Sequence, residues 1–450
     1  MSTVAVILAA GQGKQMKSAL PTALHPILGD PALLWVLRTL PPSVSGAVVV
    51  VPPGTGQVTQ ALDHWTRQGL VPCQATPVGQ SAPPESGDAV RAMIAELDRL
   101  EATRVLILYG DAPLLESSTV ERLASSPAMV LAPDSHAFTE SNQLDRNLEG
   151  THPATTEWVA CCLPWKELRS ALVERQDAPG QGEFPLSDAV TTITERIHVA
   201  VEYGDPQELA RMASRLDQSR LQAHARNRIN RRWMEEGVTF LDPISTVVGP
   251  RVVLGMDVLV EPMARLEGDV RVGQGTRIGQ GSVIRDSLIG AEVDIRPYCV
   301  VQQADVSRGV KLGPFAHLRE GSVLGENVHV GNFVETKKAI LHAGAKANHL
   351  SYLGDAEVGE RTNIGAGFIS CNYDGFNKHR TVIGKDVFVG SDVQLVAPVS
   401  LGDGAIIGAG STITRDVPAD ALALTRAPLV VKESAAERLR EKLRAKRDRG

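Results

Sequence analysis

Hydrophobic positions recur every sixth residue through the C-terminal half of the chain. Three runs carry this period, from Val272 to Ile284, from Leu312 to Val330 and from Ile383 to Ile413. Most of the aliphatic residues are followed by glycine or another small residue, as in Leu312-Gly313. Such a period is the hexapeptide signature of a parallel β-helix, whose rungs are too small to bury their own side chains and must stack. The pattern therefore predicts a β-helix over residues 242–433.

The period is interrupted twice, between about Thr336 and Leu353 and between Ser370 and Arg380. Both interruptions are rich in Lys, His, Asn and Tyr, whereas the regular rungs are dominated by small and aliphatic residues. We therefore expect the functional side chains of the β-helix within these two segments.

The first 205 residues alternate short apolar runs with helical patterns. Buried strands are predicted over residues 4–10, 47–51, 105–109 and 129–132, and helices over residues 31–40, 89–100 and 118–125. This alternation indicates an α/β domain with a Rossmann-like, mostly parallel sheet and helices on both faces.

A long helix is predicted between the two domains. Apolar residues recur at helical spacing from Pro206 to Glu236, with Pro206 near the first turn and Gly237 just past the end. This linking segment, residues 206–241, precedes a β-helix that begins after Asp242-Pro243. Residues 434–450 are charged and repeat-free, so they are predicted to form a short helical tail.

Composition narrows the classes of protein that fit. A chain of 450 residues needs more than one core. No run approaches ~18 apolar residues, so no membrane span is expected, and the N-terminus carries no secretion signal, which favours a cytoplasmic protein. The five cysteines are odd in number and lack metal-type spacing, as expected of reduced thiols. A net charge of −6 argues against general nucleic-acid binding.

A glycine-rich turn follows the first predicted strand in Leu8-Ala9-Ala10-Gly11-Gln12-Gly13. Glycines at this position let backbone amides approach a phosphate closely, so Leu8, Gly11 and Gly13 are candidate nucleotide-binding residues. Asp111 ends a later strand, where a carboxylate can hold Mg²⁺ against a triphosphate. Taken alone, Asp111 could equally cap a turn.

These segments, with Met16-Lys17-Ser18 and Leu24-His25, look like those of sugar-1-phosphate nucleotidyltransferases. With its C-terminal half included, the chain resembles the bifunctional N-acetylglucosamine-1-phosphate uridyltransferase/glucosamine-1-phosphate N-acetyltransferase (GlmU) family. The resemblance implies an N-terminal reaction that joins UTP and N-acetylglucosamine-1-phosphate with Mg²⁺, and a left-handed C-terminal β-helix. It further implies a place in the biosynthesis of the UDP-N-acetylglucosamine used for peptidoglycan and lipopolysaccharide.

The α/β domain departs from the family pattern at charged positions. The family loops G-x-G-T-R-M and P-K-x-L-H carry Arg and Lys where this chain has Gln15 and Thr22. In the uracil-binding segment, Gln80-Ser81-Ala82 replaces a glycine and a histidine. The family's sugar contact falls near residues 158–160, and its second magnesium ligand near residues 203–206, again with different residues.

These departures lead us to expect that uridyl transfer is impaired. Phosphoryl transfer depends on positioning and on cations that face the transferred group. Losing one preorganised donor typically costs ~10²–10³ in rate. Lys14 and Lys17 could compensate in part, and Asp205 could replace the missing magnesium ligand.

The two interruptions of the β-helix match the family closely. They contain Asn348-His349, Tyr352, Asn363, and the run Cys371-Asn372-Tyr373-Asp374-Gly375-Phe376-Asn377-Lys378. An amino group must be neutral to attack a thioester, and a histidine with a pKa near ~6.5 can accept its proton. His349 is therefore the candidate general base. No step needs a thiol nucleophile, so Cys371 is predicted to be a small core residue.

The resemblance assigns the remaining roles. The sugar phosphate would be bound by Arg319, Lys337, Tyr352, Asn363 and Lys378. Acetyl-CoA, the co-substrate, would be held by Ala366, Ser391, Ala409 and Arg426. The Tyr373 amide and the Ser391 hydroxyl would stabilise the oxyanion, while Asn372 would orient the amine. Family members are trimers, so a homotrimer is expected.

We therefore expect a glucosamine-1-phosphate N-acetyltransferase with an impaired N-terminal site, for which Mg²⁺ matters only if that site works. One alternative is a fully bifunctional enzyme. Another treats the N-terminal half as a non-catalytic binding or assembly module. A third is acetylation of a different sugar-1-phosphate amine.

Overall fold

The computed structural model describes residues 2–11, 13–52, 56–79, 88–133, 158–176 and 186–447, without the side chains of residues 88–92, 175–176, 186–188 and 191. The sequence departure at Gln80-Ser81-Ala82 lies outside these ranges. Two compact units are present, one of residues 1–235 and 247–252 and the other of residues 236–246 and 253–450. In the described part of the chain, no helix is long and apolar enough to cross a membrane.

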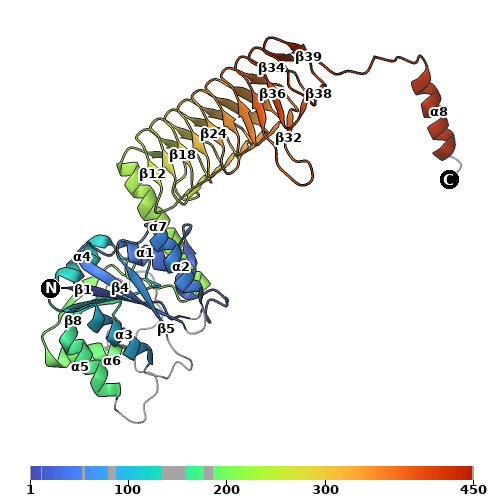
Figure 1. Ribbon diagram of the computed structural model, residues 1–450. Helices are drawn as coiled ribbons and strands as arrows, with labels where there is room; N and C mark the ends of the chain where they lie inside the picture. Colours follow the sequence, from blue (N-terminus) through green and yellow to red (C-terminus); the bar gives the residue numbers. More distant parts are fainter. Residues whose placement is uncertain are drawn as a thin grey trace. The chain divides into compact units, whose positions relative to one another are not determined.

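The first unit is an α/β domain with helices packed around a sheet (Figure 1). The sheet has seven strands in the order β5-β4-β1-β6-β8-β7-β9. Neighbouring strands run parallel except β8, which is antiparallel to both β6 and β7. The strands are β1 (Thr3–Leu8), β4 (Val44–Val51), β5 (Ala75–Gly79), β6 (Arg104–Tyr109), β7 (Met129–Pro133), β8 (Ala160–Pro164) and β9 (Ala200–Gly204). The helices are α1 (Ala32–Arg38), α2 (Gly56–Arg67), α3 (Asp88–Arg99), α4 (Ser117–Ser125), α5 (Trp165–Gln176), α6 (Leu186–Arg196) and α7 (Arg215–Glu235). A 3-10 turn, Thr22–Leu24, and the short strands β2 (Pro26–Ile27) and β3 (Asp30–Pro31) precede α1.

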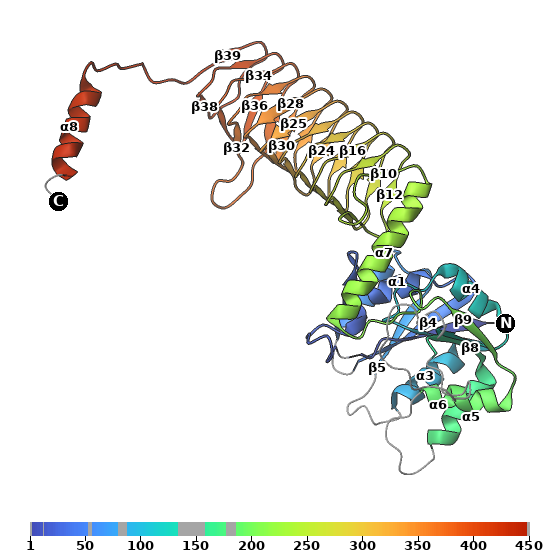
Figure 2. The same ribbon diagram turned by 180° about the vertical axis from the view of Figure 1, so that it is seen from behind.

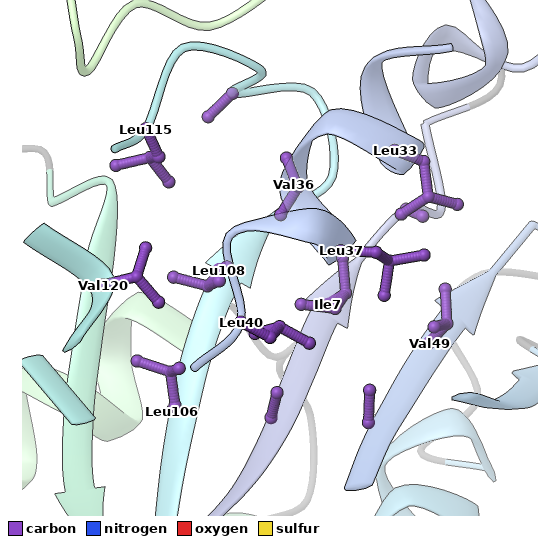
Figure 3. Close-up of a cluster of buried hydrophobic side chains, with 14 of the residues drawn as sticks. Ile7, Leu33, Val36, Leu37, Leu40, Val49, Leu106, Leu108, Leu115 and Val120 are labelled. Carbon is purple, nitrogen blue, oxygen red and sulfur yellow. The ribbon is translucent and has the colours of Figure 1, made fainter. Parts of the chain in front are cut away.

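Each face of this sheet is buried under helices. On β1, Ala5 and Ile7 join one apolar cluster with α1, α2 and α4 (Figure 3), while Val4 and Val6 join another with α3, α5 and α6. Successive strand residues point to opposite faces, so an uninterrupted apolar run suits a strand covered on both sides. Burying each such side chain contributes about 1.5–3 kcal/mol. The predicted mostly parallel sheet with helices on both faces is confirmed.

The linking helix was predicted to begin too early. It begins at Arg215 rather than near Pro206, because Ser214 and Asp217 form a reciprocal N-terminal cap. The Asp217 carboxylate accepts bonds from the Ser214 amide at 2.8 Å and hydroxyl at 2.7 Å, and the Asp217 amide donates to the Ser214 hydroxyl at 3.2 Å. Gly237, just past the end, has a φ of +91° as expected of a helix-terminating glycine.

The second unit is a parallel β-helix with three sheets (Figure 2). Its first sheet contains β10 (Thr239–Phe240), β13 (Leu259–Val260), β16 (Arg277–Ile278), β19 (Asp294–Ile295), β22 (Lys311–Leu312), β25 (His329–Asn332), β28 (Lys346–His349), β31 (Asn363–Ile364), β34 (Phe388–Val389), β37 (Ile406–Ile407) and β39 (Leu422–Ala423). Within this unit the second contains β14 (Arg265–Glu267), β17 (Val283–Arg285), β20 (Val300–Gln302), β23 (His317–Leu318), β26 (Glu335–Lys337), β29 (Tyr352–Gly354), β32 (Ile369–Cys371), β35 (Gln394–Val396) and β38 (Thr412–Ile413). The short strand β11 (Val247–Val248) belongs to the first unit. The third contains β12 (Val253–Leu254), β15 (Arg271–Val272), β18 (Leu288–Ile289), β21 (Asp305–Val306), β24 (Val323–Leu324), β27 (Ile340–Leu341), β30 (Ala356–Val358), β33 (Thr381–Ile383) and β36 (Val399–Leu401).

The periodic aliphatic residues form the core of this β-helix. In the first sheet Ile278, Ile295, Leu312 and Val330 stack in register and are each fully buried. The hexapeptide prediction and the left-handed parallel β-helix fold class are thereby confirmed. The first rung already includes Thr239–Phe240, ahead of the expected start at Asp242.

The two interruptions of the period differ in structure. Across the first, the coil continues, because Val330 pairs with Ala347 and Thr336 with Leu353, so that small or polar residues fill inward positions. Across the second, residues 371–380 form a hairpin that leaves the coil after β32, closed by an antiparallel bridge between Tyr373 and Lys378 (Figures 1 and 2). After the last rung, α8 (Ala435–Arg447) forms the predicted helical tail, and no residue on it is buried.

The cysteines are free thiols, as expected. Cys371 is only partly buried, however, so its assignment to the core was wrong. Side chains alternate along β32, and because Ser370 takes the buried inward position, Cys371 points away from the interior.

Candidate active site

Four of the predicted catalytic and coenzyme residues line one edge of the β-helix. His349, Ala366, Ser391 and Ala409 each stand two positions after an inward residue of the first sheet, and these inward residues pair rung by rung. Asn332 occupies the same place one rung earlier, opposite His349. Residues far apart in sequence are thereby stacked in one column.

The His349 ring is fixed by a hydrogen bond to that neighbour. Its Nδ1 lies 2.5 Å from Asn332 Oδ1. A carbonyl oxygen can only accept, so Nδ1 donates this bond, and in the neutral ring Nε2 is then the nitrogen that carries the lone pair. The side chain is exposed at the edge. This is the tautomer that a general base requires.

The Asn372 side chain is likewise fixed by a hydrogen bond. It is buried at the base of the hairpin, and its Nδ2 donates to Asp355 Oδ2 at 2.5 Å. Its Oδ1 thus points as an acceptor, suited to an amine N–H. The hairpin is closed by bonds from His379 N to Asn372 O and from Asp374 N to Asn377 O. Neither bond uses the Tyr373 amide, the predicted oxyanion donor.

Two of the predicted phosphate ligands belong to an ion-pair cluster on the second sheet. Arg319 and Lys337 occupy matching positions on adjacent rungs. Arg319 Nη1 donates to Glu335 at 2.8 Å, and Lys337 Nζ lies 2.8 Å from Glu320 Oε1. These pairs hold the cations in place, and the hydrogen bond to Lys337 lowers the pKa of Glu320.

The other predicted sugar ligands lie on neighbouring elements. Tyr352 stands on β29 opposite Glu335, and Asn363 begins β31 in the first sheet. Lys378 is exposed on the hairpin. The predicted ligands therefore gather on the two sheets that flank the corner at residues 349–352, and on the hairpin beside them.

The predicted coenzyme residues form a compact edge. Arg426 Nε donates to the Ala409 carbonyl at 3.1 Å, which joins two of them directly. Gly365 and Gly390 let successive turns approach closely, because a Cβ on Gly365 would lie 2.4 Å from the Gly390 carbonyl carbon. The resulting narrow wall of small residues leaves room for an extended ligand along it.

The glycine turn of the first unit has the expected shape. Gly13 has a φ of +71°, and a Cβ there would lie 2.7 Å from the Leu20 carbonyl oxygen. The Gly11 carbonyl accepts the Thr22 amide at 3.1 Å, which joins the turn to the next loop. Leu8 ends β1 just before it. Thr22 is buried and Gln15 is exposed, and neither carries the charge that the family places there.

Asp111 already has a cation. Both of its carboxylate oxygens accept bonds from Arg211, at 3.0 and 3.1 Å. The same guanidinium stacks over the Tyr109 ring at 3.5 Å, and the Met212 amide donates to the Asp111 carbonyl at 2.8 Å. Asp205, considered as a second magnesium ligand, instead accepts the Gln207 amide at 2.9 Å. The described residues contain no cluster of three potential metal ligands. Because Mg²⁺ is usually bound by one or two carboxylates together with substrate phosphates, the feature that opposes a metal at Asp111 is its bidentate pairing with Arg211.

Sequence reasoning missed the partners of the site residues. Asn332, Asp355 and Arg211 were not singled out. Asn332 lies one coil from His349, whereas Arg211 lies 100 residues from Asp111 and no local pattern links them.

Known proteins match both units. Residues 5–237 match the MobA-like NTP transferase domain, and residues 380–415 match the bacterial transferase hexapeptide family. A protein named bifunctional protein GlmU, from Acidithiobacillus ferrooxidans, is 38% identical over 95% of this chain and 97% of its own length. Proteins of the same name from Stutzerimonas stutzeri and Staphylococcus haemolyticus are 40% and 39% identical, over 95% and 96% of this chain and 97% and 99% of their own.

Proposed function

This chain belongs to the GlmU family and is an acetyl-CoA-dependent N-acetyltransferase, and we propose that its acceptor is glucosamine-1-phosphate. The proposal rests chiefly on the edge column, where His349 exposes Nε2 beside a wall of small residues. The product would be N-acetylglucosamine-1-phosphate, which supplies UDP-N-acetylglucosamine.

In the proposed reaction the sugar amine attacks the thioester carbonyl carbon. The C–N bond forms as the C–S bond breaks, and the coenzyme leaves as a thiolate. His349 Nε2 accepts the proton from the amine and can then protonate the thiolate, so no net proton is gained or lost. Asn372 Oδ1 would orient the amine, while the Tyr373 amide and the Ser391 hydroxyl would stabilise negative charge on the acetyl oxygen.

The sugar phosphate would bind at Arg319, Lys337 and Lys378. Arginine and lysine bind phosphate by charge-assisted hydrogen bonds. The pairing of Arg319 and Lys337 with Glu335 and Glu320 preorganises them and also confines the site to an anion that can compete with those carboxylates. Tyr352 and Asn363 would contribute hydrogen bonds to the sugar.

We also propose that uridyl transfer is impaired. The ion pair between Asp111 and Arg211 supports this, because a divalent cation would have to displace a bidentate guanidinium. The neutral residues Gln15 and Thr22, at positions where the family has Arg and Lys, also support impaired uridyl transfer. A fully bifunctional enzyme is the second candidate, favoured by the name that the relatives share.

A homotrimer is part of the proposal. Tyr298, Phe315 and Phe333 stack on three successive rungs, with centroids 5.4 and 5.2 Å apart, although each is about half exposed. Burying such a ladder against another copy would remove apolar surface from water. Sedimentation at the mass of three chains would support this, whereas a monomer at micromolar concentration would count against it.

Assaying the two half-reactions separately on the full-length protein tests the proposal. Acetyl-CoA and glucosamine-1-phosphate should release thiol rapidly, while UTP, N-acetylglucosamine-1-phosphate and Mg²⁺ should release little pyrophosphate. Absence of thiol release would overturn the acetyltransferase assignment. Pyrophosphate release at a comparable rate would establish the bifunctional alternative.

A further inference from the structure

The first unit contains a cavity of about 760 Å³ away from the glycine turn. Its walls come from α1, the residues around the start of α4, the segment after β9, and α7. Gly11, Gly13 and Asp111 do not line it. The volume is in the range of cavities that hold small organic ligands.

Helix α7 presents one polar face to this cavity. His224, Asn227, Arg228, Arg231 and Glu235 recur at spacings of three and four residues and all line it. The opposite face of the helix carries the buried residues Leu221, Ala225 and Trp233. This polar face therefore lines a half-open pocket, in which His224 and Arg228 are partly buried while Asn227, Arg231 and Glu235 are exposed.

The charge in the cavity is positive. Four arginines line it, Arg38, Arg228, Arg231 and Arg232, against three carboxylates, Glu116, Asp205 and Glu235. Arg228 Nη1 donates a hydrogen bond to the Leu114 carbonyl at 2.7 Å and lies 3.4 Å from Glu116 Oε1. Asp205 is engaged by the Gln207 amide. Four arginines against three carboxylates leave the lining with one excess positive charge.

Near Arg38, two arginines share one carboxylate, which leaves an excess of positive charge there. The partner of Arg38, Asp30, is buried and is shared with Arg251, which binds it bidentately at 2.9 and 3.0 Å while Arg38 stays at 3.7 Å. Burial lowers the pKa of Arg38, and the neighbouring Arg251 lowers it further. An anion in the cavity would stabilise the charged form.

The cavity also has an apolar wall of Trp35, Leu115, Ile229 and Pro250. The Trp35 indole is fixed by a bond from Nε1 to the Ile27 carbonyl at 3.0 Å. A planar body could stack on such a ring while its charged groups reach the arginines.

We propose that this cavity binds an organic polyphosphate of nucleotide size, at a site distinct from both the acetyl-transfer edge and the glycine turn. The arginines on α7 bind its phosphates, and the wall around Trp35 accepts its planar body. The proposal does not depend on which sugar phosphate the β-helix acetylates.

Isothermal titration of the full-length protein with ADP tests this site, with adenosine as the uncharged probe. ADP should bind and adenosine should not. Arg231→Gln should weaken ADP binding about tenfold, the usual effect of losing one charge-assisted hydrogen bond. Arg220→Gln is the matched control, an exposed arginine of α7 that does not line the cavity, and it should leave binding unchanged.

ADP could also occupy the coenzyme edge, and Arg426→Gln separates the two sites. If Arg426→Gln loses ADP binding while Arg231→Gln binds ADP as the parent does, the nucleotide lies at the β-helix and the proposal is overturned. Absence of ADP binding at about 1 mM would overturn it as well. Arg231 is exposed, so the variant should fold, and an unchanged melting temperature would verify this.

Discussion

The glycine turn of the first unit and the edge of the β-helix are the two candidate sites of the molecule, and they differ in how their functional atoms are engaged. At the edge, Asn332 holds His349 through Nδ1 and Asp355 holds Asn372 through Nδ2, so neither bond occupies His349 Nε2 or Asn372 Oδ1, the atoms that the proposed reaction uses. In the first unit, Arg211 holds both oxygens of Asp111. The comparison teaches that a retained fold says little about activity until the partners of each functional atom are known.

Replacing the proposed base should have the largest effect. His349→Ala should lower the rate of acetyl transfer ~10²–10⁴-fold, because it removes the proton acceptor. Thiol release measures the rate, and circular dichroism verifies that the β-helix is folded. His342→Ala is the control, since His342 pairs with Glu357 at 2.9 Å on the third sheet and should change the rate little. Near-normal turnover in His349→Ala would refute the assignment.

Restoring charge in the first unit should have the next largest effect. Gln15→Arg combined with Thr22→Lys should raise pyrophosphate release at least tenfold, since each preorganised cation is worth ~10²–10³ in rate. Gln68→Arg adds one of the two charges at an exposed position of this unit and should leave pyrophosphate release unchanged. If the double variant stays as slow as the parent, the missing charges are not the cause; adding Arg211→Ala then tests whether the Asp111 ion pair is.

A smaller effect is expected where binding rather than chemistry is altered. Lys337→Gln should raise KM for the sugar phosphate about tenfold with little change in kcat, as for one lost charge-assisted contact. Lys338→Gln is matched to it, because Lys338 is the exposed next residue. Equal KM values in the two variants would remove Lys337 from the phosphate site.

The smallest effect concerns stability. His25 is buried with Nδ1 3.1 Å from Arg215, and burial, followed by the charge of Arg215, lowers its pKa. The unfolded chain, whose histidines titrate near ~6.5, then binds a proton more readily than the folded one, so stability is lost as pH falls through that value. The melting temperature of His25→Gln should fall less than that of the parent between about pH 8 and 5.5. Parallel decreases would contradict this.

Much of the fold was predictable because its signals are local. The six-residue period identified the β-helix, since every rung repeats the same inward position, and the apolar runs located β1, β4, β6 and β7. The start of α7 was predicted too early because Pro206 suits a first helical turn, whereas the reciprocal cap of Ser214 and Asp217 begins the helix at Arg215.

The partners in the site were harder to predict because they depend on register. Three six-residue rungs make an 18-residue coil, which would set His349 beside Gly331. The coil there has 17 residues, as the pairing of Asn332 with His349 shows. This one-residue difference in coil length determines whether the imidazole of His349 has a hydrogen-bond partner, and no local sequence pattern reveals the length of the coil.

The hairpin after β32 has a consequence for how acceptor choice could change. Thr381 pairs back to Ala356 across a 25-residue coil, yet the next coil returns to 18 residues, from Thr381 to Val399. Because each rung touches only its neighbours, an insertion here does not propagate. Residues 372–380, which include Asn372, Tyr373 and Lys378, can therefore vary in sequence without disturbing the neighbouring coils. Changes in this hairpin could therefore alter recognition of the acceptor while leaving His349, the proposed general base, in place.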